Sequence, residues 1–171
     1  MIREATIEDS EILSEIISES HRDVAERFSL TPENCPKHPS NCTSSWIKAD
    51  FARGVRYFLM FQEGDALGCT GLEIQSPDIC YLERLSVLPE MRSNRFGVEL
   101  LRHALDCAVS NGVSKVSIGI IDRYTELKEW YRKLGFIEVG TKTFPHLPFT
   151  VCFMELKVGK TASNPFNGLA L

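Results

Sequence analysis

Three extended runs in close succession, between residues 55 and 89, constrain the fold of this chain more than any other feature. The runs VRYFLMFQ, ALGCTGLEIQ and ICYLERLSVLP are rich in apolar, aromatic and β-branched residues, and the turn sequences EGD and SPD separate them. Strands joined by turns this short usually lie next to each other and run antiparallel. The pattern therefore predicts three neighbouring antiparallel strands in the middle of the chain.

Helical and extended segments alternate on both sides of these runs. On the N-terminal side we expect a strand over residues 2–6, a helix from a capping box at Thr6 and Asp9 through about residue 19, and further helical segments over 21–30 and 43–53. On the C-terminal side we expect helices over 96–111 and 126–134, and strands over 114–121, 136–143 and 149–157. This order predicts an α/β fold, with a mixed, mostly antiparallel central sheet flanked by helices.

Size and composition fit one globular domain. The chain has 171 residues, of which 43% are apolar and 25% are charged, and this is enough to bury a sizeable core. We expect the domain to cover residues 1–158. The remaining stretch, residues 159–171 (GKTASNPFNGLAL), is rich in small and turn-forming residues and is expected to be a flexible tail.

Charge and cysteine content narrow the location and the partners. No apolar run is long enough for a membrane span, and the N-terminus is charged from its third residue, so no signal peptide is readable. Cys69, Cys80, Cys107 and Cys152 lie in apolar runs, as reduced thiols do. A net charge of -4 and a pI near 5.6 argue against nucleic acid as the main partner. We therefore expect a cytoplasmic protein that binds neither membrane nor nucleic acid.

The segment LSVLPEMRSNRFGVELLRHAL carries the clearest chemical signal. A strand runs through Pro89 into a polar turn, and a helix follows from Phe96. The first N–H groups of a helix have no partner within it and lie at the positive end of its dipole, so they bind anions. Arg92 and Arg95 add positive charge, and Gly97 lets a ligand approach the backbone. The segment predicts a phosphate-binding turn, with an ordinary capped surface turn as the alternative.

This turn resembles the acyl-CoA pyrophosphate loop of the GNAT acyltransferase superfamily, whose usual form is Gln/Arg-x-x-Gly-x-Gly/Ala. In RSNRFG, Arg92 and Gly97 match the first and last positions, whereas Arg95 stands in place of the first glycine. An arginine at that position can add a phosphate contact. The resemblance assigns cofactor binding to the residues Arg92, Ser93, Asn94, Arg95, Phe96, Gly97 and Val98.

A second motif, WYRKLGF over residues 130–136, resembles the GNAT segment in which a helix ends at Leu-Gly-Phe and enters the next strand. Tyr131 falls on the tyrosine that members commonly use as a general acid, which protonates the departing CoA thiolate. A partly buried aromatic residue at a helix C-terminus is the alternative. Tyr124 stands where members often have an asparagine that holds the pantetheine arm. We count Tyr124 among the cofactor-binding candidates without carrying over that contact.

The run YLERLSVLP supplies the candidate base. Strict alternation places Glu83 and Arg84 on opposite faces of the strand. Apolar neighbours disfavour the charged form of a carboxylate, which raises its pKa and suits it to accept a proton from an ammonium group. A structural Glu83 paired with an arginine is an equal alternative. The resemblance also implies that backbone N–H groups at Leu85, Ser86 and Val87 bind pantetheine and polarise the thioester carbonyl.

A further group of residues lies outside the two motifs. Cys35, His38 and Cys42 are spaced C-x2-H-x3-C in a long loop, and His146 lies in FPHLPF. Zinc takes such ligands, but the spacing fits no common zinc finger, so we expect no metal. The loop and the FPHLPF turn are expected at the acceptor end of a GNAT domain, with His38 and His146 as polar contacts or auxiliary bases. Plain surface histidines are the alternative.

The resemblance spans residues 2 to about 157 and implies an N-acetyltransferase. Acetyl-CoA is then the co-substrate, and a primary amine of a small molecule or peptide attacks it directly in a ternary complex. No cysteine lies in an arrangement that suggests an acyl-enzyme. Members often pair through their C-terminal strands, which leaves a homodimer open. Two other classes also stay open: a non-catalytic acyl-CoA-binding module, favoured by Arg95 and Tyr124, and a zinc-stabilised interaction protein.

Overall fold

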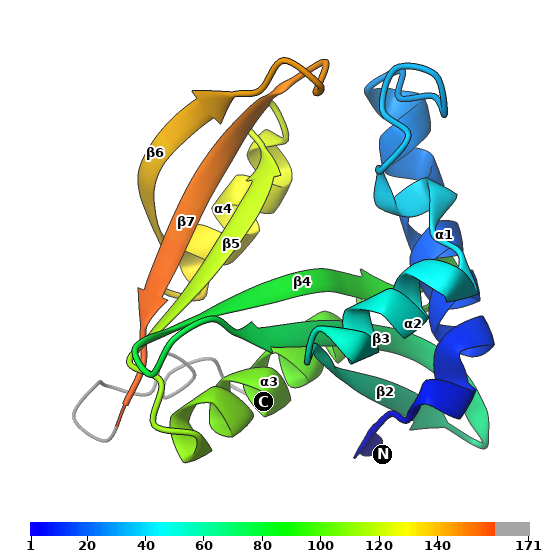
Figure 1. Cartoon of the computed structure of the whole chain (residues 1–171), viewed down its shortest axis with the longest axis vertical. Coiled ribbons are helices and arrows are strands. Elements are labelled where there is room, and N and C mark those ends of the chain that lie inside the picture. Colours follow the sequence, from blue (N-terminus) through cyan, green and yellow to red (C-terminus); the bar gives the residue numbers. More distant parts are fainter. Residues whose placement is uncertain (160–171) are drawn as a thin grey trace. The chain divides into compact units, whose positions relative to one another are not determined.

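The computed structural model describes residues 1–159, and the chain divides into two compact units (Figure 1). The first unit holds Met1–Glu73 and Leu82–Ala104, and the second holds Ile74–Tyr81 and the chain from Leu105 onward. The expected flexible tail lies, from residue 160, outside the described residues, so the tail and the domain boundary at residue 158 stay predictions. Within residues 1–159, no helix combines the length and the apolar character that a membrane span requires.

The first unit builds its sheet from the three runs that the sequence singled out. Its strands are β1 (Ile2–Glu4), β2 (Arg56–Gln62), β3 (Asp65–Ile74) and most of β4 (Ile79–Val87). Its helices are α1 (Ser10–Arg27), α2 (Ser44–Ala52), the first turns of α3 (Phe96–Ser110) and the short 3-10 helices η1 (Ile7–Asp9), η2 (Pro39–Asn41) and η3 (Pro89–Met91). β2 pairs antiparallel with β1 and β3, and β4 is the next neighbour of β3. The predicted run of three neighbouring strands is confirmed.

Successive side chains of a strand point to opposite sides of a sheet, so apolar residues of β2 pack on both faces. Tyr57 and Leu59 of β2 pack in one cluster with apolar residues of α1 and α2, while Met60 packs with Leu67 of β3 and Leu100 of α3. Figure 1 accordingly shows α1 and α2 on one side of these strands and α3 on the other. The period-two pattern of β2 thus creates two small cores, one on each side of the sheet.

α1 is one helix of 18 residues, and the predicted break between residues 19 and 21 is wrong. Neither glycine nor proline interrupts this stretch, and the buried face continues from Leu13 and Ile17 through Ser20 and Ala25. The short side chains of the last two residues weaken the apolar signal without ending the helix. The predicted capping box is present at the start of η1, just before α1, where the backbone N–H of Thr6 donates to the Asp9 carboxylate at 2.8 Å.

An irregular residue interrupts β4 beside the candidate base. Arg84 has a φ of +51°, in the left-handed region that a residue with a side chain rarely adopts. The neighbouring side chains Glu83 and Arg84 then both reach the same helix: Glu83 contacts Arg53 at the C-cap of α2, and Arg84 contacts Asp50. The prediction that Glu83 and Arg84 lie on opposite faces is therefore wrong, because the left-handed residue breaks the alternation.

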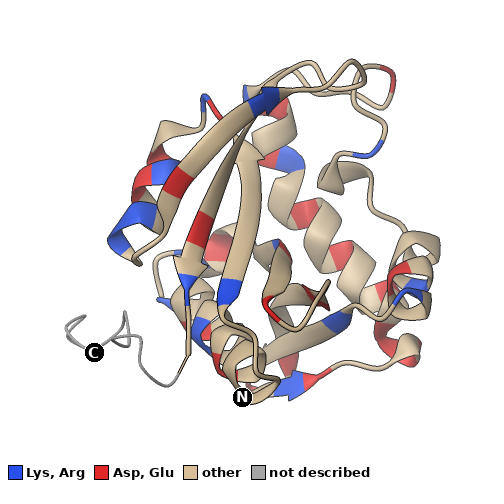
Figure 2. Cartoon of the chain, turned by 60° about the vertical axis from the view of Figure 1, so that its left-hand side comes forward, with Lys and Arg blue, Asp and Glu red and all other residues tan. Residues whose placement is uncertain are grey.

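The second unit contains the later strands and α4 (Thr125–Lys133). β5 (Lys115–Ile121) pairs parallel with the start of β4 and antiparallel with β7 (Thr150–Lys157), and β7 pairs antiparallel with β6 (Ile137–Thr143). α4 carries both acidic and basic residues, with Glu126 in its first turn and Arg132 and Lys133 in its last (Figure 2). Hydrogen bonds join the seven strands in the order β1-β2-β3-β4-β5-β7-β6, which confirms the predicted mixed sheet.

Candidate active site

The predicted site residues are divided between the two units. Glu83, His38, the strand residues Leu85–Val87 and the turn from Arg92 to Val98 belong to the first unit, whereas Tyr124, Tyr131 and His146 belong to the second. Each group has its own geometry and its own electrostatic environment.

The predicted phosphate turn lies between η3 and α3. Ser93 and Arg95 have φ values of +71° and +63°, so Arg95 adopts the conformation for which the family's glycine is suited. The carbonyl of Arg95 accepts the backbone N–H groups of Val98 at 2.9 Å and Glu99 at 3.1 Å. Phe96 and Gly97 form the start of α3, and their N–H groups take no part in its helical ladder. The turn therefore offers amide donors at a helix N-terminus, as predicted.

The side chain of Arg92 is held within the first unit. Its Nε donates to the carbonyl of Val87 at 3.2 Å, and its two terminal nitrogens donate to the Asp23 carboxylate and the carbonyl of Ser20, both in α1. The sequence assigned Arg92 to the phosphate site by its position in the motif. These contacts join the turn to α1 and to the end of β4 instead, and Asp23 was not foreseen as a partner.

The strand segment assigned to pantetheine makes a close approach to β3. The Ser86 hydroxyl donates to the Arg84 carbonyl at 2.9 Å, and the Leu88 N–H donates to the Leu67 carbonyl at 3.0 Å. A Cβ atom added to Gly68 of β3 would lie 2.8 Å from the Ser86 carbonyl oxygen, which is too close for any real side chain. Glycine at position 68 is therefore a requirement of the packing between the two strands.

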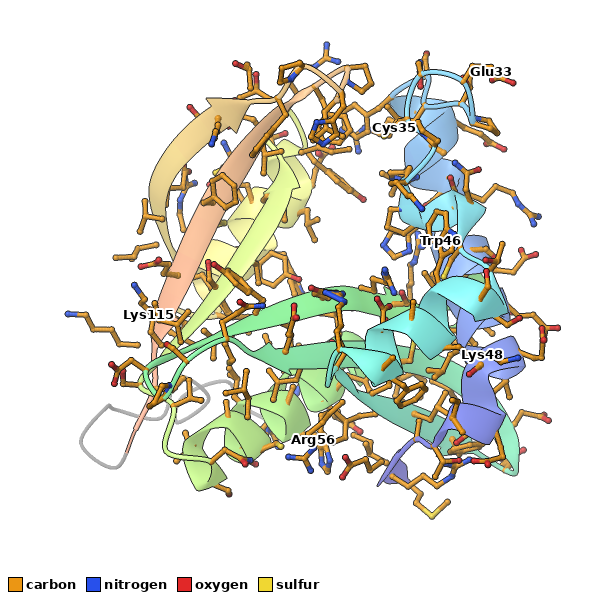
Figure 3. All side chains as sticks on the ribbon, in the orientation of Figure 1. Glu33, Cys35, Trp46, Lys48, Arg56 and Lys115 are labelled. Carbon is orange, nitrogen blue, oxygen red and sulfur yellow. The ribbon has the colours of Figure 1, made fainter. Side chains whose placement is uncertain are left out.

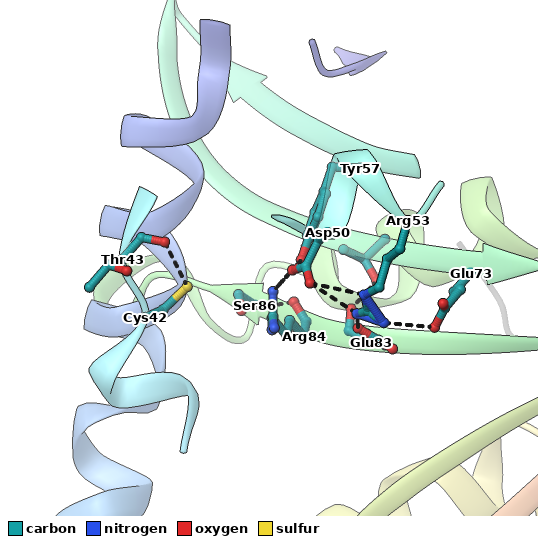
Figure 4. A network of polar contacts seen from close by, with 10 residues as sticks. Cys42, Thr43, Asp50, Arg53, Tyr57, Glu73, Glu83, Arg84 and Ser86 are labelled. Carbon is teal, nitrogen blue, oxygen red and sulfur yellow. Dashed lines mark hydrogen bonds and ion pairs between the residues drawn. The ribbon is translucent and has the colours of Figure 1, made fainter. Parts of the chain in front are cut away.

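Glu83 belongs to a network of charged side chains in the first unit (Figure 4). The Arg53 guanidinium donates to Glu83 at 3.2 Å, to Glu73 at 3.1 Å and to Asp50 at 2.9 Å. On the other side, Asp50 accepts the Tyr57 hydroxyl at 2.7 Å and the guanidinium of Arg84. Three carboxylates thus share two guanidinium groups. The ion pair that the structural interpretation of Glu83 requires is present, and it does not exclude a role as a base.

Burial has the largest influence on the pKa of Glu83. Burial raises the pKa of Glu83 above the ordinary carboxyl range, the charges of Arg53 and Arg84 oppose that effect, and the nearby Glu73 and Asp50 carboxylates reinforce it. Burial likewise raises the pKa of the Tyr57 phenol. A raised pKa makes the Glu83 carboxylate a stronger proton acceptor than an exposed glutamate, which is the property that the sequence predicted for it.

Tyr131 of α4 has an apolar environment. Its side chain is only 5% exposed, and its ring contacts Trp130 and Phe136 edge to face, with centroids 4.9 and 5.2 Å away. Burial raises the pKa of the phenol, so Tyr131 keeps its proton at neutral pH. Tyr124 is the N-cap of the same helix, and its backbone N–H donates to the Ile121 carbonyl at 2.9 Å. Of these two tyrosines, only Tyr131 has a feature relevant to acid catalysis, namely the proton that its phenol retains.

The loop histidines differ from each other. His38 is 6% exposed, its Nδ1 lies 2.8 Å from the Ser40 hydroxyl, and its ring meets that of His21 in α1. Burial and the neighbouring His21 lower the pKa of His38 to about 4, so it is a neutral packed residue and not the surface residue of the alternative interpretation. His146 is exposed and lies against Phe144.

The side chains of Cys35, His38 and Cys42 are all buried. Cys35, labelled in Figure 3 on the loop after α1, is 1% exposed, and burial raises the pKa of Cys42 to about 11. Over residues 1–159, no three His, Cys, Asp or Glu side chains converge as metal ligands do. The two thiols are packed as small apolar groups.

Several residues around Glu83 were missed by sequence reasoning. Asp50 and Arg53 are three residues apart on α2, a spacing that favours an ion pair and was readable. The contact from Arg53 to Glu83 spans 30 residues, and the contact from Arg84 to Asp50 spans 34. Neither long-range contact has a signal in a single sequence.

Comparison with known families and proteins gives a consistent result. Residues 17–136 match the Acetyltransferase (GNAT) family, a segment that contains Glu83, the turn at Arg92–Val98 and Tyr131. An uncharacterised N-acetyltransferase of Schizosaccharomyces pombe is 28% identical over 109 residues, which cover 63% of this chain and 66% of the relative. The match thus spans slightly less than two thirds of the relative's own length.

Solved structures show the same fold. A phosphinothricin acetyltransferase from Sinorhizobium meliloti, in complex with acetyl-CoA, gives a TM-score of 0.71 at 20% identity and covers 98% of this chain and 94% of its own. A PaiA N-acetyltransferase from Thermoplasma acidophilum, in complex with coenzyme A, gives 0.69 at 21% identity and covers 92% and 98%. The predicted GNAT fold is confirmed.

Proposed function

This chain belongs to the acetyltransferase (GNAT) family, and we propose that it transfers an acetyl group from acetyl-CoA to a primary amine. The observation that carries the proposal is the strand, turn and helix at residues 85–98, where left-handed residues lead into the N-terminal amides of α3. That geometry suits the diphosphate of CoA. The amine acceptor is a small molecule or a peptide.

The reaction is a direct attack in a ternary complex. Glu83, directly or through a water molecule, accepts a proton from the ammonium group, and the free amine nitrogen bonds to the thioester carbonyl carbon. The raised pKa of Glu83 favours this proton transfer. The carbon–sulfur bond then breaks, and Tyr131 gives its proton to the sulfur, so CoA leaves as a thiol. The nitrogen loses its second proton as the amide forms, and that proton restores the Tyr131 phenol. Backbone N–H groups at Leu85, Ser86 and Val87 stabilise the carbonyl oxygen.

A non-catalytic acyl-CoA-binding module is the second candidate. It is favoured by Arg95 at the family's glycine position and by Tyr124 at the usual asparagine position. The left-handed φ of Arg95 weakens the first point, because the arginine adopts the backbone conformation that glycine would provide.

The test measures both binding and turnover. Calorimetry with CoA and acetyl-CoA reports donor binding, and thiol release from acetyl-CoA with a broad panel of primary amines reports transfer. We expect saturable donor binding and amine-dependent release of thiol. Binding without release for every amine would support the module, and absence of donor binding by the folded protein would overturn both proposals.

The remaining parts of the proposal rest on the sequence. We also propose that His38 and His146 lie near the acceptor, that the protein is cytoplasmic, that one domain ends at residue 158 and that the chain can form a homodimer. The buried, neutral state of His38 makes it a packing or hydrogen-bonding residue of the loop and a poor auxiliary base.

A further inference from the structure

We propose that Asp23 of α1 is a positioning residue for CoA binding, and that it acts by holding Arg92 at the start of the phosphate turn. The inference rests on the proposed function, because it assumes that the turn at Arg92–Val98 binds the diphosphate. It assigns a role to a residue outside the family motifs, and it changes the role of Arg92 from a phosphate ligand to a structural link.

The hydrogen bonds of Arg92 carry the argument. A guanidinium group has five N–H donors in a rigid plane. Arg92 uses its Nε on the Val87 carbonyl, one terminal nitrogen on Asp23, and the other on both Asp23 and the Ser20 carbonyl. Four donor positions are thus directed at acceptors of the chain itself. At most one N–H is left for a phosphate oxygen, so the fork cannot grip a diphosphate as a free arginine would.

The charge of Asp23 supports the same conclusion. A carboxylate bound to Arg92 offsets the positive charge that this residue brings to the turn, and by itself it repels an anionic ligand. Placing Asp23 there weakens a direct phosphate contact from Arg92. The same pair makes sense as a clamp, since a two-pronged Arg–carboxylate interaction fixes orientation as well as distance.

The clamp holds the part of the backbone that needs to be ordered. Arg92 comes directly before Ser93, and Ser93 and Arg95 both have unfavourable left-handed φ values. An unrestrained turn would leave that conformation for part of the time. The side-chain hydrogen bonds of Arg92 fix the start of the turn against α1 and against the end of β4, where the pantetheine-binding amides are expected. Pre-ordering the turn reduces the entropy that CoA binding must overcome.

The two roles predict opposite signs for one substitution. If Arg92 is a phosphate ligand, Asp23→Asn frees it and removes a repulsive charge, so CoA binds more tightly. If Asp23 is a positioning residue, Asp23→Asn loosens the turn and CoA binds more weakly, by about three- to five-fold for a pair that is partly exposed. Calorimetric titration with CoA measures the Kd. Glu26→Gln is the matched control, because it removes the same charge from an exposed position on α1 and should leave the Kd unchanged.

Three further variants separate positioning from loss of fold. Arg92→Lys keeps the charge but loses the fork, so it should weaken CoA binding as much as Arg92→Gln, and the Asp23→Asn and Arg92→Gln double variant should bind as Arg92→Gln alone does. A general loss of stability would add in the double variant. Tighter or unchanged binding by Asp23→Asn, or full binding by Arg92→Lys, overturns the inference while wild-type binding leaves the proposed function intact. No CoA binding by the wild type removes both.

Discussion

The two units of the molecule treat backbone strain differently. Within residues 1–159, the five non-glycine residues with left-handed φ are Ser29, Glu63, Arg84, Ser93 and Arg95, and they all lie in the first unit. In the second unit, as far as residue 159, glycine occupies every such position. Each left-handed residue with a side chain costs about 1–2 kcal/mol, and such strain collects where surrounding contacts over-determine the backbone.

The electrostatic environments differ in the same way. Glu83 shares a network with five other polar side chains, Arg84 among them, whereas the ring of Tyr131 contacts two aromatic rings. Burial raises the pKa of both groups; neighbouring charges further modify the pKa of Glu83, whereas burial is the sole cause at Tyr131. The pKa of the proposed base thus depends on burial and on charged neighbours, and that of the proposed acid depends on burial alone.

The largest effect is expected from the second unit. Tyr131→Phe removes one hydroxyl and keeps the ring packing, so kcat should fall by about 100-fold or more while the melting temperature stays close to that of the wild type. Thiol release and thermal unfolding measure the two quantities. Trp130→Phe, which changes the adjacent ring and leaves the phenol, is the control. A Tyr131→Phe variant that is fully active would show that the hydroxyl is not the acid.

A second substitution tests whether the charged network supports the strained strand. Arg84→Ala leaves Asp50, whose side chain is 7% exposed, with one guanidinium instead of two, and should lower the free energy of unfolding by about 2–3 kcal/mol. Arg84→Gly removes the same contacts and relieves the left-handed backbone, so it should be more stable than Arg84→Ala by about 1 kcal/mol. Chemical denaturation provides both values. Equal stability of the two variants would argue against strain at this residue.

Replacing residues at left-handed positions in both units tests whether glycine relieves backbone strain there. At position 95, glycine should be more stable than alanine by about 1 kcal/mol, because Arg95 is left-handed. In the second unit, Gly112→Ala should cost a similar free energy, since its φ is +78° and no atom lies within 4 Å of the added Cβ. If Gly112→Ala is neutral, the glycine there does not relieve strain.

The smallest effect is expected on the pH profile. Arg53 lowers the pKa of Glu83, so Arg53→Ala should raise that pKa further. Because Glu83 accepts a proton only when it is ionised, the acid-side limb of kcat/KM should move to higher pH, while the plateau above it stays. Arg53→Lys keeps a positive charge and should leave the limb near its wild-type position. A limb that moves to lower pH in Arg53→Ala would exclude Glu83 as the base.

Local patterns predicted the elements well, and long-range contacts account for what was missed. The runs from residue 55 to 89 and the turn before α3 have periodicities and turn residues that act over a few positions, and the structure confirms them. Side chains of Ser20 and Ala25 are too small to mark the continuing face of α1. The left-handed φ of Arg84 and Arg95 cannot be read from a residue type that usually avoids it.

The sequence supplied candidates for the site but not their partners. Glu83 and Tyr131 were chosen by position and motif, and their catalytic roles stay predictions. Two of the three partners of Arg92 come from α1, 69 and 72 residues away along the chain. A contact over that distance depends on how the elements pack, and packing is the information that one sequence lacks.

The glycine at position 68 limits how this protein can diversify. Any side chain there would meet the carbonyl oxygen of Ser86, a main-chain atom that cannot rotate away as a side chain could. Mutational drift and directed evolution therefore cannot enlarge this position without moving β3 away from β4. Because that segment is expected to hold the pantetheine arm, a bulkier residue at position 68 would spoil the grip on the acyl donor before any reacting group was altered.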